Sequence, residues 1–161
     1  MRKQPRIKNL TENRRARYDY EILETYEAGL VLYGFEVKAI KTGHISLKGS
    51  YVIIKNNEAY LLNAFIHPYQ PANVPKDYNP ERTRKLLLNK SEIRSLIGKS
   101  KQKGLTLIPL RLYTKRGKIK LEFGIGKGKR KIDKREKIKK REVEREIQRK
   151  MGVKGFDRKL L

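Results

Sequence analysis

Short runs of β-forming residues, separated by glycine and asparagine, dominate the pattern of apolar and polar positions in the middle of the chain. Residues 20–26 alternate in part, and residues 30–33 form a second apolar run after Gly29. Such runs are typical of strands that bury one face. The pattern therefore predicts two short strands here, and then a short helix over residues 35–41 that ends at Gly43.

Two hairpins are predicted further along. Residues 51–62 carry two apolar runs on either side of Asn56-Asn57, and asparagine tolerates the left-handed backbone of a tight hairpin turn. Residues 105–125 carry two longer runs around a turn that contains Gly117. In both segments the turn residues and the flanking apolar runs each indicate a β-hairpin.

A loop and a helix lie between these hairpins. Four prolines within residues 67–84 exclude a regular element, and a long loop inside a compact domain is usually a binding loop or a mobile one. Residues 89–103 repeat apolar positions with helical spacing. Asn89 or Ser91 can cap this helix, and Gly104 ends it.

These elements favour a mainly β fold: a small closed barrel of the OB-fold type, with one or two short helices flanking it and a basic arm at each end. The OB-fold commonly binds nucleic acid through its strand face and its loops. Periodicity alone does not prove that the sheet closes, so a mixed α+β sandwich stays open as the alternative.

The charge of the chain points to a partner. Lysine and arginine number 41 against 17 acidic residues, which gives a formal net charge of +24. Because such a field attracts polyanions, nucleic acid is the first candidate and an anionic membrane surface the second. Without cysteine, and with only His44 and His67, neither a disulfide scaffold nor a metal site is expected. No apolar run could span a membrane and no secretory signal is recognisable, so we expect a cytoplasmic protein.

Basic residues gather at the two ends. Residues 1–17 hold seven basic residues and one acidic residue, and residues 127–150 hold 13 and five. The sequence therefore predicts a basic N-terminal arm over residues 1–12, a domain over 13–126 and a basic tail over 127–161.

The tail has the signals of a helix but little to bury. Asp133 and Glu136 have capping-box spacing, and Glu146 with Lys150 is an i,i+4 ion pair. Apolar residues are sparse, and a lone polar helix is marginal in water. We therefore expect the tail to be disordered when free and helical when bound.

Several residues are candidates for chemistry. Tyr18, Tyr69 and Tyr78 lie beside basic or loop segments and could stack on bases, although a tyrosine in this chain is more often a strand-core residue. The glycine-rich stretch 124–130 lacks the residues of a Walker A loop and is interpreted as a flexible hinge.

An enzyme is not expected. Glu36, His44 and His67 are conceivable acid–base groups, but the histidines lie at loop positions. No paired-carboxylate or nucleophile–base motif is recognisable, and no cofactor is implied.

A series of short motifs adds a family resemblance. They are N-R-R-A-R-Y-D-Y over residues 13–20, E-A-G over 27–29, G-F-E-V-K over 34–38, R-K-L-L-L-N over 84–89, K-G-L-T over 103–106, K-G-K-R over 127–130 and D-K-R over 133–135. In order and spacing they resemble the SsrA-binding protein family, SmpB, over about residues 12–150.

The resemblance implies an OB-fold adaptor of trans-translation. Such a protein binds the tRNA-like domain of transfer-messenger RNA (SsrA RNA) and delivers it to stalled ribosomes for rescue and peptide tagging. Its partners would be that RNA, bound 1:1 by a monomer, the small ribosomal subunit, and indirectly elongation factor Tu and alanyl-tRNA synthetase. The tail would occupy the decoding centre and the empty message channel. A generic OB-fold protein of ribosomal or initiation-factor type is the alternative.

The resemblance also implies site residues. The expected RNA contacts are Asn13, Arg14, Arg15, Arg17, Tyr18, Glu27, Lys38, Arg84, Lys85, Leu87 and Asn89. The expected ribosome-binding residues of the tail are Lys127, Lys129, Arg130, Ile132, Asp133, Lys134, Arg135, Lys139 and Arg141. Ile132 stands where the family often has histidine or an aromatic residue, and it has no π-face for stacking. Glu27 could accept a hydrogen bond from a base edge or a 2′-OH, or hold a neighbouring arginine.

Overall fold

The computed structural model describes residues 4–157, with side chains for all of these except 131–133 and 151–157. The chain divides into two units after Gly128. We call the first unit the β body and the second, which starts at Lys129, the tail. Each unit is described by itself.

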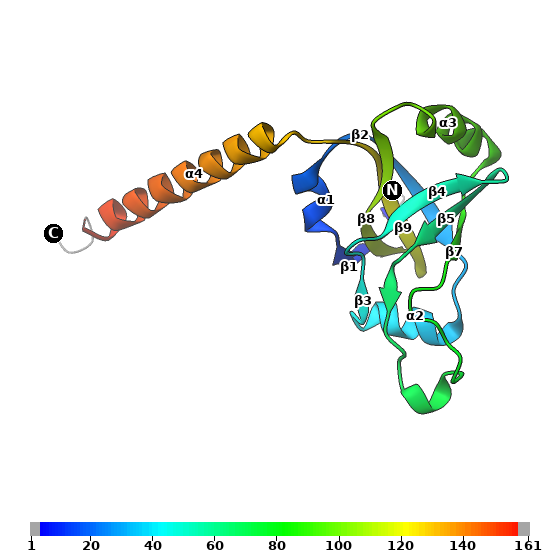
Figure 1. The fold of residues 1–161 in the computed structure, drawn as a ribbon. Coiled ribbons are helices and arrows are strands. Elements are labelled where there is room, and N and C mark those ends of the chain that lie inside the picture. Colours follow the sequence, from blue (N-terminus) through cyan, green and yellow to red (C-terminus); the bar gives the residue numbers. More distant parts are fainter. Residues whose placement is uncertain (1–3, 158–161) are drawn as a thin grey trace. The chain divides into compact units, whose positions relative to one another are not determined.

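Strands dominate the β body, with short helices between them (Figure 1). In chain order the elements are β1 (Ile7–Glu12), α1 (Arg14–Asp19), β2 (Tyr20–Leu30), α2 (Gly34–Lys41), β3 (Ile45–Ser46), β4 (Tyr51–Lys55), β5 (Glu58–Leu62), β6 (Phe65–Ile66), the 3-10 turn η1 (Pro71–Asn73), β7 (Arg84–Leu87), α3 (Lys90–Ser100), β8 (Leu105–Lys115) and β9 (Lys118–Gly128). The tail contains α4 (Lys131–Asp157).

The main sheet is antiparallel throughout. Its strand order is β1-β8-β4-β5-β7-β2-β9, and β9 also pairs with β8. The short strands β3 and β6 pair with each other. The mainly β class expected from the sequence is therefore confirmed.

Both predicted hairpins are present. β4 and β5 pair around Asn56 and Asn57, whose φ angles are 51° and 58°. β8 and β9 pair around Arg116 and Gly117, with φ angles of 53° and 76°. Left-handed backbone at two successive turn residues is the geometry that matches the twist of the flanking strands.

The two predicted short helices are also confirmed. α2 ends just before Thr42, and Gly43 follows with a φ of 82°. α3 begins after Asn89, whose backbone N–H donates to the Glu92 carboxylate at 3.2 Å. Of the two N-cap candidates, Asn89 rather than Ser91 occupies the position, so the helix starts two residues earlier than a Ser91 cap would allow.

The N-terminal third differs from the prediction. The sequence predicts two strands over residues 20–33, but β2 runs without a break from Tyr20 to Leu30. Residues 7–12, expected in a basic arm, form β1 and pair with β8, which gives their backbone groups partners at the edge of the sheet. The helix α1 was not predicted, because its stability comes from tertiary contacts described below.

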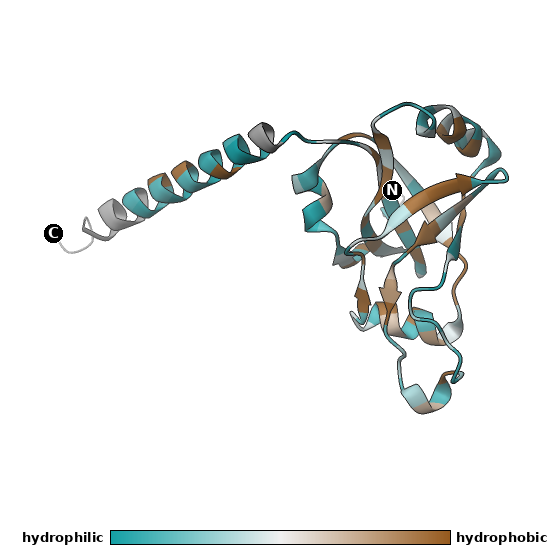
Figure 2. Cartoon of the chain, in the orientation of Figure 1, coloured by the Kyte–Doolittle hydropathy of each residue, from teal (hydrophilic) through white to brown (hydrophobic). Residues whose placement is uncertain are grey.

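The core is built mainly from alternate residues of the last hairpin and its neighbours. Leu107, Leu112, Leu121 and Phe123 are among its buried side chains. Figure 2 shows brown, hydrophobic stretches on the strands of the β body, whereas the described part of α4 is mostly teal with isolated brown bands. The apolar side chains of the described residues are thus concentrated in the β body.

The glycines near the end of β9 serve packing. A Cβ on Gly124 would lie 2.7 Å from Ile22 Cγ2 and 3.0 Å from the Glu24 carbonyl oxygen, and one on Gly126 would lie 2.7 Å from Ile108 Cδ1. The hinge interpretation of this stretch is wrong up to Gly128, because these residues continue strand β9, and Gly124 and Gly126 leave no room for a side chain.

The tail is a helix that begins at Lys131, two residues before the predicted cap at Asp133. The side chains of Ile132 and Asp133 lie outside the described residues. The predicted pair of Glu146 and Lys150 is present at 3.3 Å. No helix within residues 4–157 combines the length and apolar character that a membrane crossing requires.

Candidate nucleic-acid interface

Two of the sequence motifs, about 60 positions apart, meet in the sheet. β2 and β7 pair antiparallel with Gly29 opposite Leu87. A Cβ on Gly29 would lie 3.4 Å from Leu87 Cβ and 3.7 Å from Lys120 Nζ, so the glycine allows these side chains to approach the backbone. The E-A-G and R-K-L-L-L-N motifs therefore form one surface.

A groove opens at this junction, with a volume of about 340 Å³. Leu87 at its edge is 53% exposed, so its side chain is accessible to a ligand. Apolar side chains and two lysines, Lys118 and Lys120, line the groove together, and we call it the β7 groove. Its lining residues are Gly29, Leu30, Leu32, Val37, Leu87, Gly117, Lys118, Ile119 and Lys120.

Glu27 lies two residues before Gly29 on β2. Its carboxylate accepts a hydrogen bond from the Tyr113 hydroxyl and pairs with Lys115 Nζ at 3.3 Å. The Tyr113 hydrogen bond lowers the pKa of Glu27, partial burial opposes it, and Lys115 and Lys120 add to the lowering. One expectation was that Glu27 holds a neighbouring arginine; in the structure it binds Tyr113 and Lys115 instead. The Glu27 carboxylate stays ionised and partly exposed.

The N-R-R-A-R motif divides into anchoring and exposed residues. The Asn13 side chain accepts from the Ala16 N–H at 3.3 Å and donates to the Pro109 carbonyl at 3.1 Å. Ala16 packs against Ile108 and Leu110 of β8. These contacts hold α1 on the sheet and explain why local propensity did not reveal it.

Two arginines of this motif have acidic partners, since Arg15 pairs with Asp19 at 3.3 Å and Arg17 with Glu122 of β9 at 3.8 Å. Arg14, Arg15 and Arg17 are exposed, whereas Tyr18 is half-buried. Asn13 and Arg15 also line a second groove of about 420 Å³ that lies away from the β7 groove residues. The predicted RNA-binding residues therefore occupy more than one surface of the β body.

The prediction that Arg84 contacts RNA is wrong. Expected as an RNA contact, its side chain is fully buried and pairs with Glu36 at 2.6 Å. It also donates to the carbonyl oxygens of Ala64, at 2.8 Å, and Pro80, at 2.9 Å. All of its hydrogen-bonding capacity is directed into the protein, so Arg84 is a structural residue that cannot contact RNA in this conformation.

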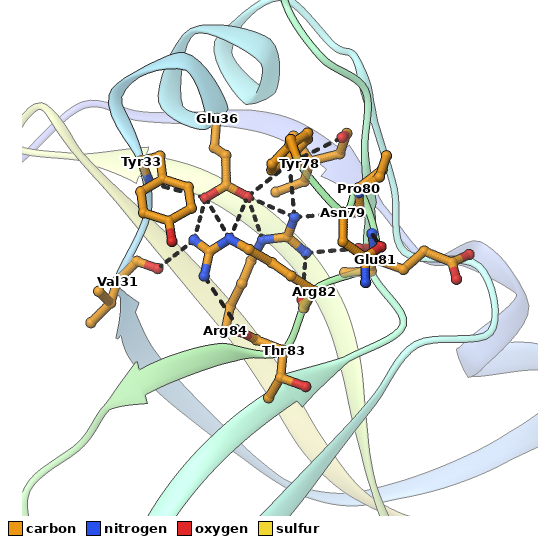
Figure 3. Close-up of polar contacts among 12 residues, drawn as sticks. Val31, Tyr33, Glu36, Tyr78, Asn79, Pro80, Glu81, Arg82, Thr83 and Arg84 are labelled. Atoms are coloured by element: carbon orange, nitrogen blue, oxygen red, sulfur yellow. Dashed lines mark hydrogen bonds and ion pairs between the residues drawn. The ribbon is translucent and has the colours of Figure 1, made fainter. Parts of the chain in front are cut away.

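Glu36 is the centre of this buried network (Figure 3). Besides Arg84, its carboxylate pairs with Arg82 and accepts from the Tyr78 hydroxyl at 3.0 Å and the Tyr33 N–H at 2.9 Å. Burial opposes ionisation of Glu36, but the Arg82 hydrogen bond, the Tyr33 N–H and the Arg84 charge outweigh it and lower its pKa. Burial and the hydrogen bond to Glu36 raise the pKa of Tyr78 to about 12.

This arrangement answers the question of acid–base chemistry at Glu36. A fully buried carboxylate that is kept ionised by two guanidiniums has no proton to donate and little basicity left. His44 and His67 are exposed loop residues, as the sequence indicated.

The other expected RNA contacts of the β body are exposed. Lys38 lies on α2, and Asn89 lies at the start of α3. Lys85 on β7 pairs with Glu58 at 2.8 Å, and this hydrogen bond raises the pKa of Lys85. An anion that binds Lys85 must therefore compete with Glu58.

The exposed tyrosines are not those that the sequence singled out. Tyr18, Tyr69 and Tyr78 are half-buried, and the Tyr78 hydroxyl is committed to Glu36. Tyr33, 53% exposed, is the most accessible aromatic side chain in the described part of the β body. Sequence reasoning missed it because Tyr33 ends an apolar run that reads as a strand.

The tail presents a dense set of cations. The pKa of Lys137 is lowered by its contact with Lys129, by burial and by the charge of Arg141. Lys127 belongs to β9, opposite Glu21. The remaining expected tail residues with described side chains lie on or just before α4 and are Lys129, Arg130, Lys134, Arg135, Lys139 and Arg141.

A basic β body with a groove lined by apolar side chains and lysines, followed by a cationic helix, has the surface of a nucleic-acid-binding protein. The family model described as SmpB protein matches residues 10–153. The chain therefore belongs to the SmpB family.

Individual relatives agree with this assignment. An SsrA-binding protein of Thermosynechococcus vestitus is 52% identical over 90% of this chain and 95% of its own length. One of Nostoc punctiforme is 52% identical over 89% of this chain and 93% of its own length. A chain in a solved structure described as "tmRNA-SmpB: a journey to the center of the bacterial ribosome" is 47% identical, covers 81% of this chain and 95% of its own length, and superposes with a TM-score of 0.64.

Proposed function

We propose that this chain is a non-enzymatic RNA-binding adaptor of trans-translation. It binds the tRNA-like domain of transfer-messenger RNA as a monomer and delivers it to stalled ribosomes in the cytoplasm. Membership of the SmpB family over residues 10–153 carries the proposal. The net charge of +24 supplies the attraction for RNA. Elongation factor Tu and alanyl-tRNA synthetase would then meet the protein through the RNA.

The β body belongs in this proposal to the closed OB-fold type. The pairings β8–β4, β4–β5, β5–β7, β7–β2, β2–β9 and β9–β8 make an unbroken circuit of strands, which supports closure. A closed sheet leaves no free edge along that circuit, and OB-folds bind RNA with a strand face and adjacent loops.

The RNA surface is centred on the β7 groove. Leu87 and Gly29 offer an apolar wall for sugar or base edges, and Lys118 and Lys120 lie where phosphates could be neutralised. Glu27, already held ionised by Tyr113, would accept a hydrogen bond from a base edge or a 2′-OH. The other proposed contacts are Arg14, Arg15, Arg17, Tyr18, Lys38, Lys85 and Asn89, with Asn13 positioning α1.

The tail completes the adaptor on the ribosome. Along α4, Ile138, Val143 and Ile147 are exposed, so the helix buries little apolar surface within its own unit. Such a helix gains most of its stability from a partner. We expect its amides to exchange rapidly in the free protein and to become protected in the decoding centre and message channel of the small subunit.

A filter-binding titration against the tRNA-like domain tests the site. Glu27→Ala should weaken binding roughly 10- to 100-fold, because it removes a charged hydrogen-bond acceptor. Glu21→Ala removes an exposed carboxylate from the same strand and should bind like the parent.

Asn89→Ala should weaken binding by a few-fold to tenfold. Because Asn89 also caps α3, Asn89→Ser serves as the control that keeps a capping oxygen. If Glu27→Ala and Asn89→Ala both retain parent affinity, the site is misassigned. Equal displacement of the RNA by bulk tRNA would favour the generic RNA-binding alternative over the adaptor.

A further inference from the structure

Tyr33 combines an exposed ring with a fixed cation beneath it. The residue lies at the N-cap of α2 with extended backbone, and its side chain is 53% exposed. The Arg82 guanidinium carbon lies 4.0 Å from the centroid of the Tyr33 ring (Figure 3). This is the distance of a stacked cation–π pair.

The buried network holds this pair in place. Arg82 Nε donates to the Glu36 carboxylate at 3.1 Å, and another Arg82 nitrogen donates to the Val31 carbonyl at 3.4 Å. Tyr33 is tied to the same carboxylate through its own N–H, at 2.9 Å. The ring and the guanidinium are therefore ordered before any ligand arrives, so stacking on them carries a small entropic cost.

The charge at this site favours an anionic ligand. Two guanidiniums, those of Arg82 and Arg84, share the single carboxylate of Glu36, which leaves one excess positive charge behind the exposed ring. Tyr33 follows directly on Leu32, which lines the β7 groove, and Val31 beside it is 48% exposed. Phe35 is a second neighbour of the ring, with its centroid 5.5 Å from that of Tyr33. The exposed part of the Tyr33 ring thus continues from a groove whose lining includes Lys118 and Lys120.

We infer that Tyr33, backed by Arg82, is a stacking platform for one unpaired RNA base at the end of the β7 groove. Aromatic rings and arginine planes are the surfaces on which proteins stack splayed-out bases. The inference rests on the proposed RNA-binding function and extends it by naming the kind of RNA feature that is bound. It also gives the Glu36 network a role, which is to fix the orientation of the platform.

The chain contains no tryptophan, so Tyr33→Trp introduces a single fluorophore at the platform. Titration of this variant with the tRNA-like domain should quench tryptophan fluorescence, with the same midpoint as filter binding. In the parallel affinity series, Tyr33→Ala and Tyr33→Leu should each bind roughly 5- to 100-fold more weakly, the usual effect of losing one stacked base. Tyr33→Phe keeps the ring and should stay within about twofold of the parent.

Leu23→Ala is the matched control, because Leu23 is a similarly exposed side chain, at 52%, near the other end of β2. Tyr33→Leu binding as tightly as the parent would overturn the platform while leaving the adaptor function intact. A Tyr33→Trp signal that stays constant through RNA saturation would do the same. Normal affinity of Tyr33→Ala for the tRNA-like domain with weakened ribosome binding would make this a ribosome-contact surface and refute stacking on a base of the tRNA-like domain. Failure of the parent itself to bind the RNA would remove both proposals.

Discussion

The fold depends on the charge of Glu36, and Glu36→Gln tests this directly. Glutamine has the shape of glutamate and keeps one carbonyl oxygen, so the substitution opens no cavity. It removes the negative charge that faces Arg82 and Arg84 and replaces one acceptor oxygen with an amide donor.

The size of the effect follows from burial. Glu36 and Arg84 are both fully buried, and the Arg82 side chain is only 22% exposed. Loss of one partner of a buried ion pair costs about 3–5 kcal/mol, because the remaining charge stays buried without compensation. A domain of this kind has a free energy of unfolding of about 5–15 kcal/mol, so Glu36→Gln should remove a large part of it.

Urea unfolding at pH 7, followed by far-UV circular dichroism, measures this loss. Glu58→Gln is the control: it breaks the exposed pair with Lys85, at 2.8 Å, and should change the midpoint far less. A midpoint for Glu36→Gln as close to the parent as that of Glu58→Gln would refute the view that the network stabilises the β body.

The pH dependence has a definite sign. Because the pKa of Glu36 is lower in the folded protein than in the unfolded chain, its contribution to stability is complete above the ordinary carboxyl pKa of about 4.3. That contribution is lost as the pH falls through the lower, folded value. The difference in stability between the parent and Glu36→Gln should therefore shrink below about pH 4.

Three further predictions concern other parts of the chain. Gly124→Ala should lower the free energy of unfolding by about 1–3 kcal/mol, because its Cβ would meet Ile22 and the Glu24 carbonyl. Gly128 has open space around it, so Gly128→Ala should leave the midpoint of urea unfolding, which measures both effects, unchanged. Deletion of residues 128–161 should leave affinity for the free RNA largely intact but abolish peptide tagging in a reconstituted system, and an affinity loss of orders of magnitude would count against it. Affinity for the RNA should fall about 10³- to 10⁵-fold between 50 and 200 mM salt if roughly 6–10 phosphates are contacted, and a flat salt profile would contradict the electrostatic part of the proposal.

Local chemistry made parts of this fold predictable. Asn56-Asn57 and Gly117 set the two hairpins, and Asn89 set the start of α3, because each acts through its own backbone conformation or its nearest neighbours. Sequence motifs with local spacing also identified the family.

Contacts between distant segments were not predictable in this way. α1 depends on Asn13 and Ala16 meeting β8 almost 100 residues later. Arg84 was predicted to be a surface cation because no residue close to it in the sequence indicates its buried partner. That partner is Glu36, 48 positions earlier. Tyr33 was overlooked for the same reason, since its value as an exposed ring depends on Arg82.

The Glu36 network also decides where the proline-rich loop tolerates change. In the described contacts, Gln70, Pro71 and Asn73 form hydrogen bonds only within their own turn, whereas Tyr78 and the Pro80 carbonyl are bonded to the buried Arg84. The outer part of the loop is thus the place to insert a label or a purification epitope. From Tyr78 to Arg84 the chain is tied to the buried network even though Asn79, Glu81 and Thr83 are exposed, so the same insertion there would disturb the folded body.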